Sequence, residues 1–193
     1  AGQVGLGDPT FAFTDVRVEA TISAEQNVTI VGGGPTLGNN DPFVILRGTG
    51  GNGYLLAMDF NDGFVALLRA DNGNVSDLEE SSSAEANIAG FDPTAAYRLE
   101  LTAIGDQLSG RIFNTAGELV AAVRGSDSTY ATGFSGVGAA INDIDTIGGP
   151  GGVGRTLLAT AFDNVSSRTI PEPSSLLLLI VGAGLLAGRR RRT

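Results

Sequence analysis

The chain contains no cysteine, histidine, lysine or tryptophan. Without cysteine it forms neither a disulfide framework nor a thiolate metal site. The missing histidine and lysine also exclude, within this chain, a Ser-His-Asp or Cys-His arrangement, a histidine metal site and a lysine Schiff base. The chemistry that remains open to it depends on carboxylates, hydroxyls, amides and arginines.

Positive charge is also scarce. All 12 basic residues are arginines, and four of them form the run Arg189, Arg190, Arg191 and Arg192. Residues 1–170 therefore hold eight arginines and 20 acidic residues, a net charge of −12. Because phosphate binding needs clustered lysine or arginine, we expect no nucleic-acid partner. Such a surface would instead attract divalent cations.

Alternation of apolar and polar residues predicts that residues 1–165 are all-β. Every second residue is apolar in DVRVEATIS (15–23) and in YRLELTA (97–103), and the second pattern places Tyr97 in the core. Further strands are expected at 27–31, 42–47, 54–60, 64–70, 107–113, 119–124, 136–141 and 157–165. Short strands separated by turns rich in glycine, asparagine and aspartate favour a two-sheet antiparallel sandwich.

Two segments in this region invite other interpretations. GTGGNG (48–53) has the spacing of a dinucleotide-binding loop, but a strand pattern follows it where that motif requires a helix, so we predict a hairpin turn. VSDLEESSSAE (75–85) begins like a capped helix, yet it has too few apolar residues to dock, and we predict a loop.

The C-terminus has a different character from the sandwich. Residues 174–188 are 15 uncharged positions; as a short hydrophobic helix they would span about 22 Å, less than the roughly 30 Å of a bilayer core. The arginines that follow would stay cytoplasmic and leave residues 1–170 outside the cytoplasm. Pro171 and Pro173 disfavour helix and would keep an extended segment accessible to a processing enzyme.

This tail closely resembles a PEP-CTERM sorting signal over about its last 23 residues. The resemblance lies in Pro171, Glu172 and Pro173, the apolar run 176–187 and the final arginines. It implies recognition by an exosortase-like membrane enzyme and removal of the tail. We therefore divide the chain into a sandwich (1–165), a linker (166–170) and a sorting signal (171–193). The alternative is a plain single-pass anchor with an incidental Pro-Glu-Pro.

A second resemblance concerns the sandwich. The stretch 95–140, followed by ATAFDNVSS (159–167), is similar to the concanavalin A-like lectin/glucanase jelly roll in its laminin-G-like branch. In that family the first strand pairs with the last, and only 13 residues precede the first clear strand here, so we expect this element to be partly missing. Since the chain begins with Ala1 and has no signal-peptide pattern, we expect a processed or truncated N-terminus.

The family resemblance implies carbohydrate binding or calcium binding. Tyr130, in the loop SDSTYATG, is the candidate sugar contact; the alternative is a tyrosine that fills a corner of the fold. Calcium takes loop oxygens, and the loops at 39–42, 59–62 and 142–145 offer Asp41, Asp59, Asp62, Asp143 and Asp145. Aspartate and asparagine are also ordinary turn residues, so the alternative, which we favour, is that these loops are plain turns.

Catalysis is not expected. Glycoside hydrolysis needs two acids roughly 5–10 Å apart, and the Glu-x-Asp-x-(x)-Glu strand of this fold's glucanases is absent. We therefore predict an exported, non-enzymatic surface or matrix protein. It would be transiently anchored in the inner membrane and would contact polysaccharide or another surface component. A carbohydrate-active hydrolase and a purely structural matrix protein are the alternatives.

Overall fold

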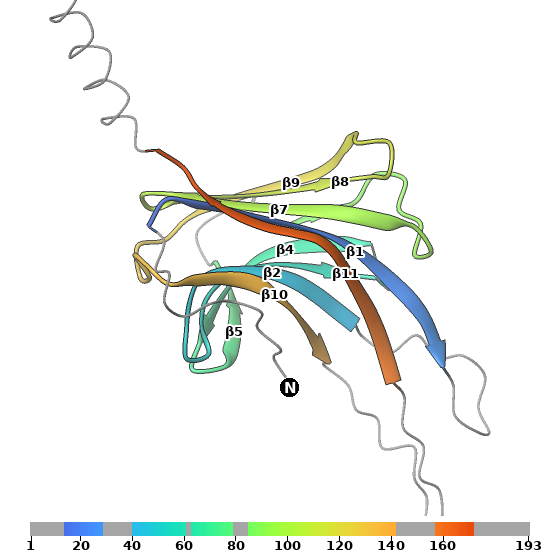
Figure 1. Cartoon of the computed structure of the whole chain (residues 1–193), viewed down its shortest axis with the longest axis horizontal. Coiled ribbons are helices and arrows are strands. Elements are labelled where there is room, and N and C mark those ends of the chain that lie inside the picture. The colour runs from blue at the N-terminus through green and yellow to red at the C-terminus, as the bar shows by residue number, and fades with distance from the viewer. Residues whose placement is uncertain (1–13, 29–39, 61–62, 79–84, 142–156, 172–193) are drawn as a thin grey trace, which may run out of the picture.

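The computed structural model describes residues 14–28, 40–60, 63–78, 85–141 and 157–171, and within these ranges the chain is all-β (Figure 1). The strands are β1 (Val16–Val28), β2 (Asn40–Thr49), β3 (Asn52–Asp59), β4 (Phe64–Asp71), β5 (Asn74–Asp77), β6 (Glu85–Asn87), β7 (Ala96–Ile104), β8 (Gln107–Phe113), β9 (Leu119–Ser126), β10 (Phe134–Ile141) and β11 (Leu157–Thr169). The same ranges include no helix with the length and hydrophobicity of a membrane span. The predicted C-terminal helix lies outside them.

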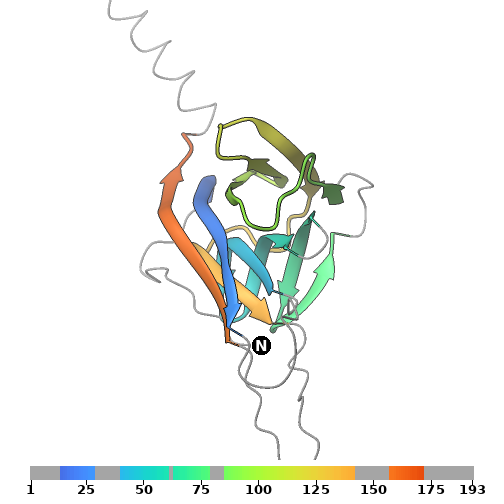
Figure 2. The ribbon, with the colours of Figure 1, turned by 90° about the vertical axis from the view of Figure 1, so that its right-hand side faces the viewer.

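Two antiparallel sheets form a jelly-roll-like sandwich, as predicted. One sheet has five strands in the order β11-β1-β7-β8-β9, and the other has the order β10-β2-β3-β4-β5 with β6 paired to β4. Figure 2 shows β7, β8 and β9 above the layer of β2 to β5, with β1 and β11 along one side. Consequently β9 and β5 are edge strands of different sheets.

The core lies between the sheets and follows the alternation seen in the sequence. The alternating apolar residues of 16–22 in β1 and 97–103 in β7, Tyr97 included, are buried and face those of β2, β3 and β4. Burying one such side chain stabilises the fold by about 1.5–3 kcal/mol. The polar positions in between point away from the core, so the outer face of the five-stranded sheet is predominantly polar.

The pairing of the first strand with the last is present. β1 pairs with β11 from Val16↔Thr169 to Val28↔Leu157, and with β7 on its other side. The element that the sequence suggested was partly missing is therefore supplied by β1. The predicted hairpin turn at 48–53 is also confirmed, since Thr49 pairs with Asn52 and the intervening glycines have φ of 56° and 89°.

Two predicted segments were wrong. The expected linker at 166–170 is mostly strand: β11 continues to Thr169, and the Ile170 amide donates to the Asp15 carbonyl at 2.9 Å. The expected loop at 75–85 contributes β5 at one end and β6 at the other, both paired to β4. Each segment has few apolar residues, but pairing with a neighbouring strand satisfies the hydrogen bonds of its backbone and so keeps it extended.

Candidate binding pocket at the sheet edges

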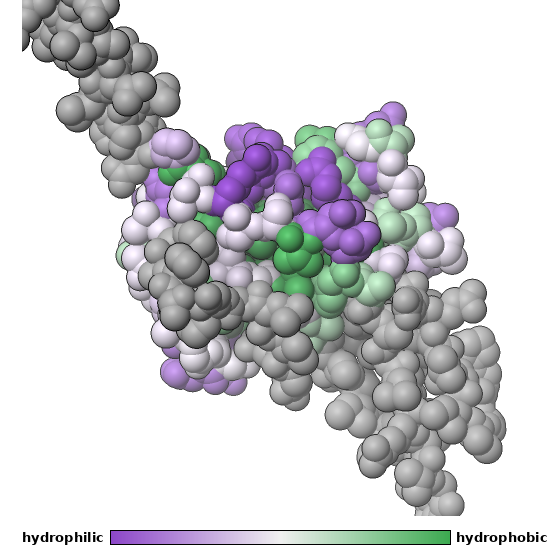
Figure 3. Space-filling view, viewed as in Figure 1, coloured by the Kyte–Doolittle hydropathy of each residue, from purple (hydrophilic) through white to green (hydrophobic). Residues whose placement is uncertain are grey.

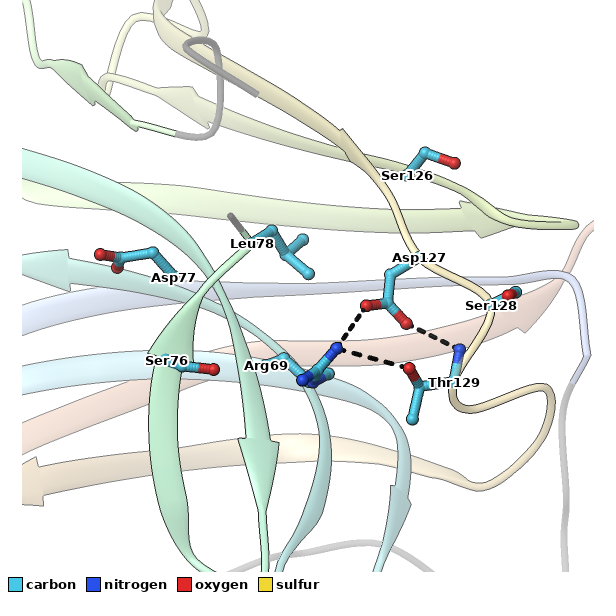
Figure 4. Close-up of a pocket in the computed structure, with 8 residues that line it drawn as sticks. All are labelled: Arg69, Ser76, Asp77, Leu78, Ser126, Asp127, Ser128 and Thr129. Carbon is cyan, nitrogen blue, oxygen red and sulfur yellow. Dashed lines mark hydrogen bonds and ion pairs between the residues drawn. The ribbon is translucent and has the colours of Figure 1, made fainter. Parts of the chain in front are cut away.

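A pocket of about 370 Å³ lies where the two sheet edges meet. One wall is β5 with the adjoining β4, and the other is the loop that follows β9 (Figure 4). Its lining is largely polar and comprises Arg69, Ser76, Asp77, Leu78, Ser126, Asp127, Ser128 and Thr129. The volume falls within the usual range of small-molecule sites, about 300–1,000 Å³. The charged groups and four hydroxyl side chains suit a ligand rich in hydroxyls.

Asp127 organises this pocket. One carboxylate oxygen accepts the Tyr54 hydroxyl at 2.6 Å and the Thr129 amide at 2.7 Å. The other accepts the Arg69 guanidinium at 2.8 Å (Figure 4). The sequence favours this local structure because aspartate readily accepts the amide two residues on, forming an Asx-turn. The loop is thus fixed to β3 and β4 through a single carboxylate.

The hydrogen bonds around the Asp127 carboxylate favour its ionised form. Burial acts to raise the pKa of Asp127, but the hydrogen bonds from Tyr54, Thr129 and Arg69 outweigh burial and lower the pKa to about 2. Burial, followed by the hydrogen bond to Asp127, raises the pKa of the Tyr54 phenol. Hydrogen bonds to Asp127 and Asp71 raise the pKa of Arg69. At neutral pH the pocket therefore presents an ionised carboxylate and a guanidinium in fixed positions.

Tyr130 follows the residues of the pocket loop, and its side chain is held by contacts with the rest of the fold. Its ring lies 5.5 Å from that of Tyr54, it packs against the core, and its hydroxyl donates to Asp71. The Tyr130 amide donates to the Tyr54 hydroxyl at 2.9 Å. These contacts match the corner-filling alternative. Its neighbours in the same loop line the pocket instead.

The buried Arg47 side chain holds the pocket loop against the rest of the fold. Arg47 is 2% exposed, donates twice to the Thr14 carbonyl at 2.9 and 2.7 Å, and donates to the Tyr130 carbonyl at 3.2 Å. Its Nη2 lies 3.7 Å from the Asp15 carboxylate. A buried charge of this kind is tolerated only where it is paired and hydrogen-bonded. Arg47 therefore connects the start of β1, the end of β2 and the pocket loop.

The predicted calcium ligands are not brought together within the described residues. No group of three or more metal-binding side chains occurs there. Asp41 lies in β2, and Asp59 ends β3 with its carbonyl accepting the Gly63 amide at 3.1 Å. The other three candidates, Asp62, Asp143 and Asp145, lie outside the described residues, so the calcium prediction stays a prediction.

The processing segment follows directly on the sandwich. Pro171 is exposed, two residues beyond the end of β11. The other predicted sorting residues, Glu172 and Pro173, and the membrane stop Arg189, Arg190, Arg191 and Arg192 lie outside the described residues. The last residues described thus present the start of the tripeptide to solvent.

Sequence reasoning pointed to this loop through Tyr130, whose predicted sugar contact stays a prediction. It chose Tyr130 for its aromatic ring, whereas Asp127, Ser128 and Thr129 line the pocket. The Asp-x-Thr spacing was a usable signal for an ordered turn. Arg69 and Ser76 gave no local signal, because they reach the pocket only through the pairing of β4 with β5.

The chain combines a jelly-roll-like β-sandwich with a C-terminal segment that matches a sorting motif. A family model described as the PEP-CTERM protein-sorting motif matches residues 169–192, beginning at the last residue of β11. A signal of this kind indicates an exported protein. No curated protein sequence matches the chain.

Solved structures resemble the sandwich. The carbohydrate binding module CBM66 from Bacillus subtilis aligns with a TM-score of 0.57 and 19% identity, over 83% of this chain and 78% of that chain. A functionally unknown protein from Saccharomyces cerevisiae aligns at 0.54 and 10% identity, over 87% and 74%. A mutant of the GH43 protein BlXynB from Bacillus licheniformis aligns at 0.51 and 11% identity, over 81% of this chain but 28% of that one. At these identities the likeness concerns the fold.

Proposed function

We propose that this is an exported cell-surface or matrix protein, sorted and processed through its C-terminal signal, whose non-catalytic sandwich binds polysaccharide in the pocket between β5 and β9. The observation that carries the binding proposal is the pocket itself. Its charged and hydroxyl lining is suited to hydrogen-bonding sugar hydroxyls. The likeness of the fold to a carbohydrate binding module supports the same ligand class.

The state of Asp127 supports a binding role over a catalytic one. A general acid for glycoside cleavage needs a raised pKa so that it holds a proton near neutral pH. The pKa of Asp127 is lowered to about 2, and Arg69 engages its second oxygen. The carboxylate is therefore suited to accept hydrogen bonds from a ligand and unsuited to donate a proton.

Binding is tested by retention on immobilised neutral and acidic polysaccharides, with and without calcium. Ser76→Ile places a bulky apolar side chain in the pocket wall and should reduce retention at least about fivefold, because each lost neutral hydrogen bond is worth about 1 kcal/mol. Asn74→Ile is the matched control, on the same strand but outside the lining. Failure of the unmodified protein to bind any polymer would refute the binding proposal.

Processing is tested separately by the mass of the surface-located protein. An exosortase-like enzyme should remove the tail, so the mature chain should end near Pro171–Pro173 and lack Arg192. A host without that enzyme should retain the full-length chain in its membrane fraction. Intact Arg192 in surface-located protein from a competent host would contradict processing.

A further inference from the structure

The outer face of the five-stranded sheet collects most of the arginines of an acidic domain. Each of its five strands contributes one: Arg168 from β11, Arg17 from β1, Arg98 from β7, Arg111 from β8 and Arg124 from β9. These are five of the eight arginines in residues 1–170, a region of net charge −12. In the space-filling view strongly hydrophilic residues gather over β1, β7 and β8 (Figure 3).

Strand register arranges three of these arginines in one row across the sheet. Directly opposed residues run Arg168↔Arg17, Arg17↔Thr102, Thr102↔Ser109 and Ser109↔Arg124. Because opposed residues share a face, the row holds three cations and two hydroxyls and no carboxylate. At a strand spacing of about 4.8 Å it crosses the sheet over roughly 19 Å. We call these five residues the arginine row.

The neighbouring row holds the negative charge and organises the other arginines. Glu100 is 4% exposed and pairs with Arg17, with Arg98 at 3.5 Å and with Arg111 at 3.4 Å. Glu19 pairs with Arg17 at 3.2 Å and with Arg98 at 3.6 Å. Three guanidiniums thus share two carboxylates. Because each guanidinium has five N–H donors, the cluster keeps donors available for an anion.

Two features of the arginine row are unfavourable for a face that binds nothing. Arg17 and Arg168 lie directly opposite each other, and like charges in such cross-strand pairs are destabilising. In addition, the Arg17 Nε is buried without a hydrogen-bond partner. Glu19 and Glu100 already offset part of the charge of Arg17, and an anionic group lying over the pair would offset the charge of Arg168 as well.

The geometry points to an acidic polysaccharide, with one carboxylate or sulfate on each sugar or every few sugars, bound along the arginine row. Its acidic groups would meet Arg168, Arg17 and Arg124 and its hydroxyls Thr102 and Ser109, since arginine recognises carboxylate by paired N–H donors. This inference rests on the proposed function, which it deepens by naming the ligand class. The arginine row would be a second binding surface, in addition to the pocket between β5 and β9.

Two observations favour this ligand over other candidates. The Phe113 ring, which would otherwise offer a stacking surface to a neutral sugar, is covered by the Arg98 guanidinium at 3.9 Å from its centroid. Duplex DNA carries one charge per about 1.7 Å and would be repelled by a domain of net charge −12. A polysaccharide with at most one charge per sugar matches a sparse row of cations better.

The test compares retention of the full sandwich on polygalacturonate and on neutral dextran at about 0.15 M salt, where charges more than about 8 Å apart are largely screened. Arg124→Ser combined with Arg168→Ser should weaken polygalacturonate binding about fivefold to tenfold, since each exposed ion pair is worth up to about 1 kcal/mol. Dextran binding should not change. Lysine at both positions should restore most of the affinity for polygalacturonate.

A second control separates local from overall charge. Asn74→Asp combined with Ala116→Asp produces the same net charge at exposed sites outside the arginine row and should bind polygalacturonate like the unmodified protein. An equal loss of polygalacturonate binding in this control would overturn the inference. Unchanged polygalacturonate binding by the variant with Arg124→Ser and Arg168→Ser, while the pocket still retains polymer, would overturn it too. Tighter binding to duplex DNA or to phosphatidylserine vesicles would also overturn it. Retention on no polymer would refute the proposed function as well.

Discussion

Replacing Asp127 by asparagine keeps the shape of the side chain and removes its charge. The carboxylate accepts hydrogen bonds on both oxygens, from Tyr54 and Thr129 on one and from Arg69 on the other. An amide has only one acceptor oxygen, so its NH₂ group must face a donor whichever way it is turned. The substitution therefore costs at least one hydrogen bond and leaves Arg69 with a weaker partner.

The pKa of Asp127 sets the magnitude and the pH dependence. A lowering from the usual 3.8 to about 2 in the folded state corresponds to about 2 kcal/mol of stability. The folded pKa lies below the unfolded one, so this contribution is complete above about pH 4 and is lost as the pH falls to about 2. The asparagine variant should be less stable by about 2 kcal/mol at pH 7 and by much less at pH 2.

Urea unfolding followed by circular dichroism at pH 7, 4 and 2 measures this difference. Other aspartates also lose stabilising interactions in acid, so the quantity to compare is the gap between the two proteins at each pH. Asp77→Asn is the matched control, because Asp77 lines the same pocket but is exposed on β5. A gap for Asp127→Asn that stays constant from pH 7 to pH 2 would refute the reasoning.

Two further substitutions test the supports of the pocket loop. Gly133→Ala would place a Cβ 2.3 Å from the Arg47 carbonyl carbon, a backbone atom that cannot turn away. The substitution should lower the free energy of unfolding by about 3 kcal/mol. An unchanged midpoint of urea unfolding would contradict the close approach. Tyr54→Phe removes the hydroxyl that accepts the Tyr130 amide and should cost about 1–3 kcal/mol in the same assay. A loss below 0.5 kcal/mol, about the least expected of one hydrogen bond, would count against this contact.

Much of the fold could be predicted because alternation reports directly on which face of a strand is buried. Residues 16–22 of β1 and 97–103 of β7 have strict period-two patterns, and the apolar residues of these segments are in the core. The pattern found the edge strands β9 and β10, but it failed at the edge strand β5 and where β11 extends beyond the core. β5 is exposed at all four positions, and residues 163–169 of β11 are exposed as well. Apolar alternation therefore could not reveal these residues as strand.

The pocket was less predictable because its parts are distant in sequence. Arg69 and Asp127 are 58 residues apart and meet only because β4, the neighbour of the edge strand β5, lies opposite the loop that follows β9. The sequence singled out the loop SDSTYATG through Tyr130 but gave no indication of the loop's partner. A site assembled between two sheets has no short motif, so the fold must be known before its residues can be chosen.

The arginine row shows that strand register can build a cationic face that composition does not predict. Arginines before the tail are at least 13 residues apart in sequence, so no sign of a cationic cluster appears there. In a sheet, however, residues far apart in sequence become neighbours whenever their strands pair, and a polar position on one strand then faces the polar positions of the next. Arg17 meets Arg168 in this way across 151 residues of sequence. The negative charge of the domain and its positive face are therefore compatible. An acidic body would repel dense polyanions, while the face would retain the sparsely charged polymer that we propose.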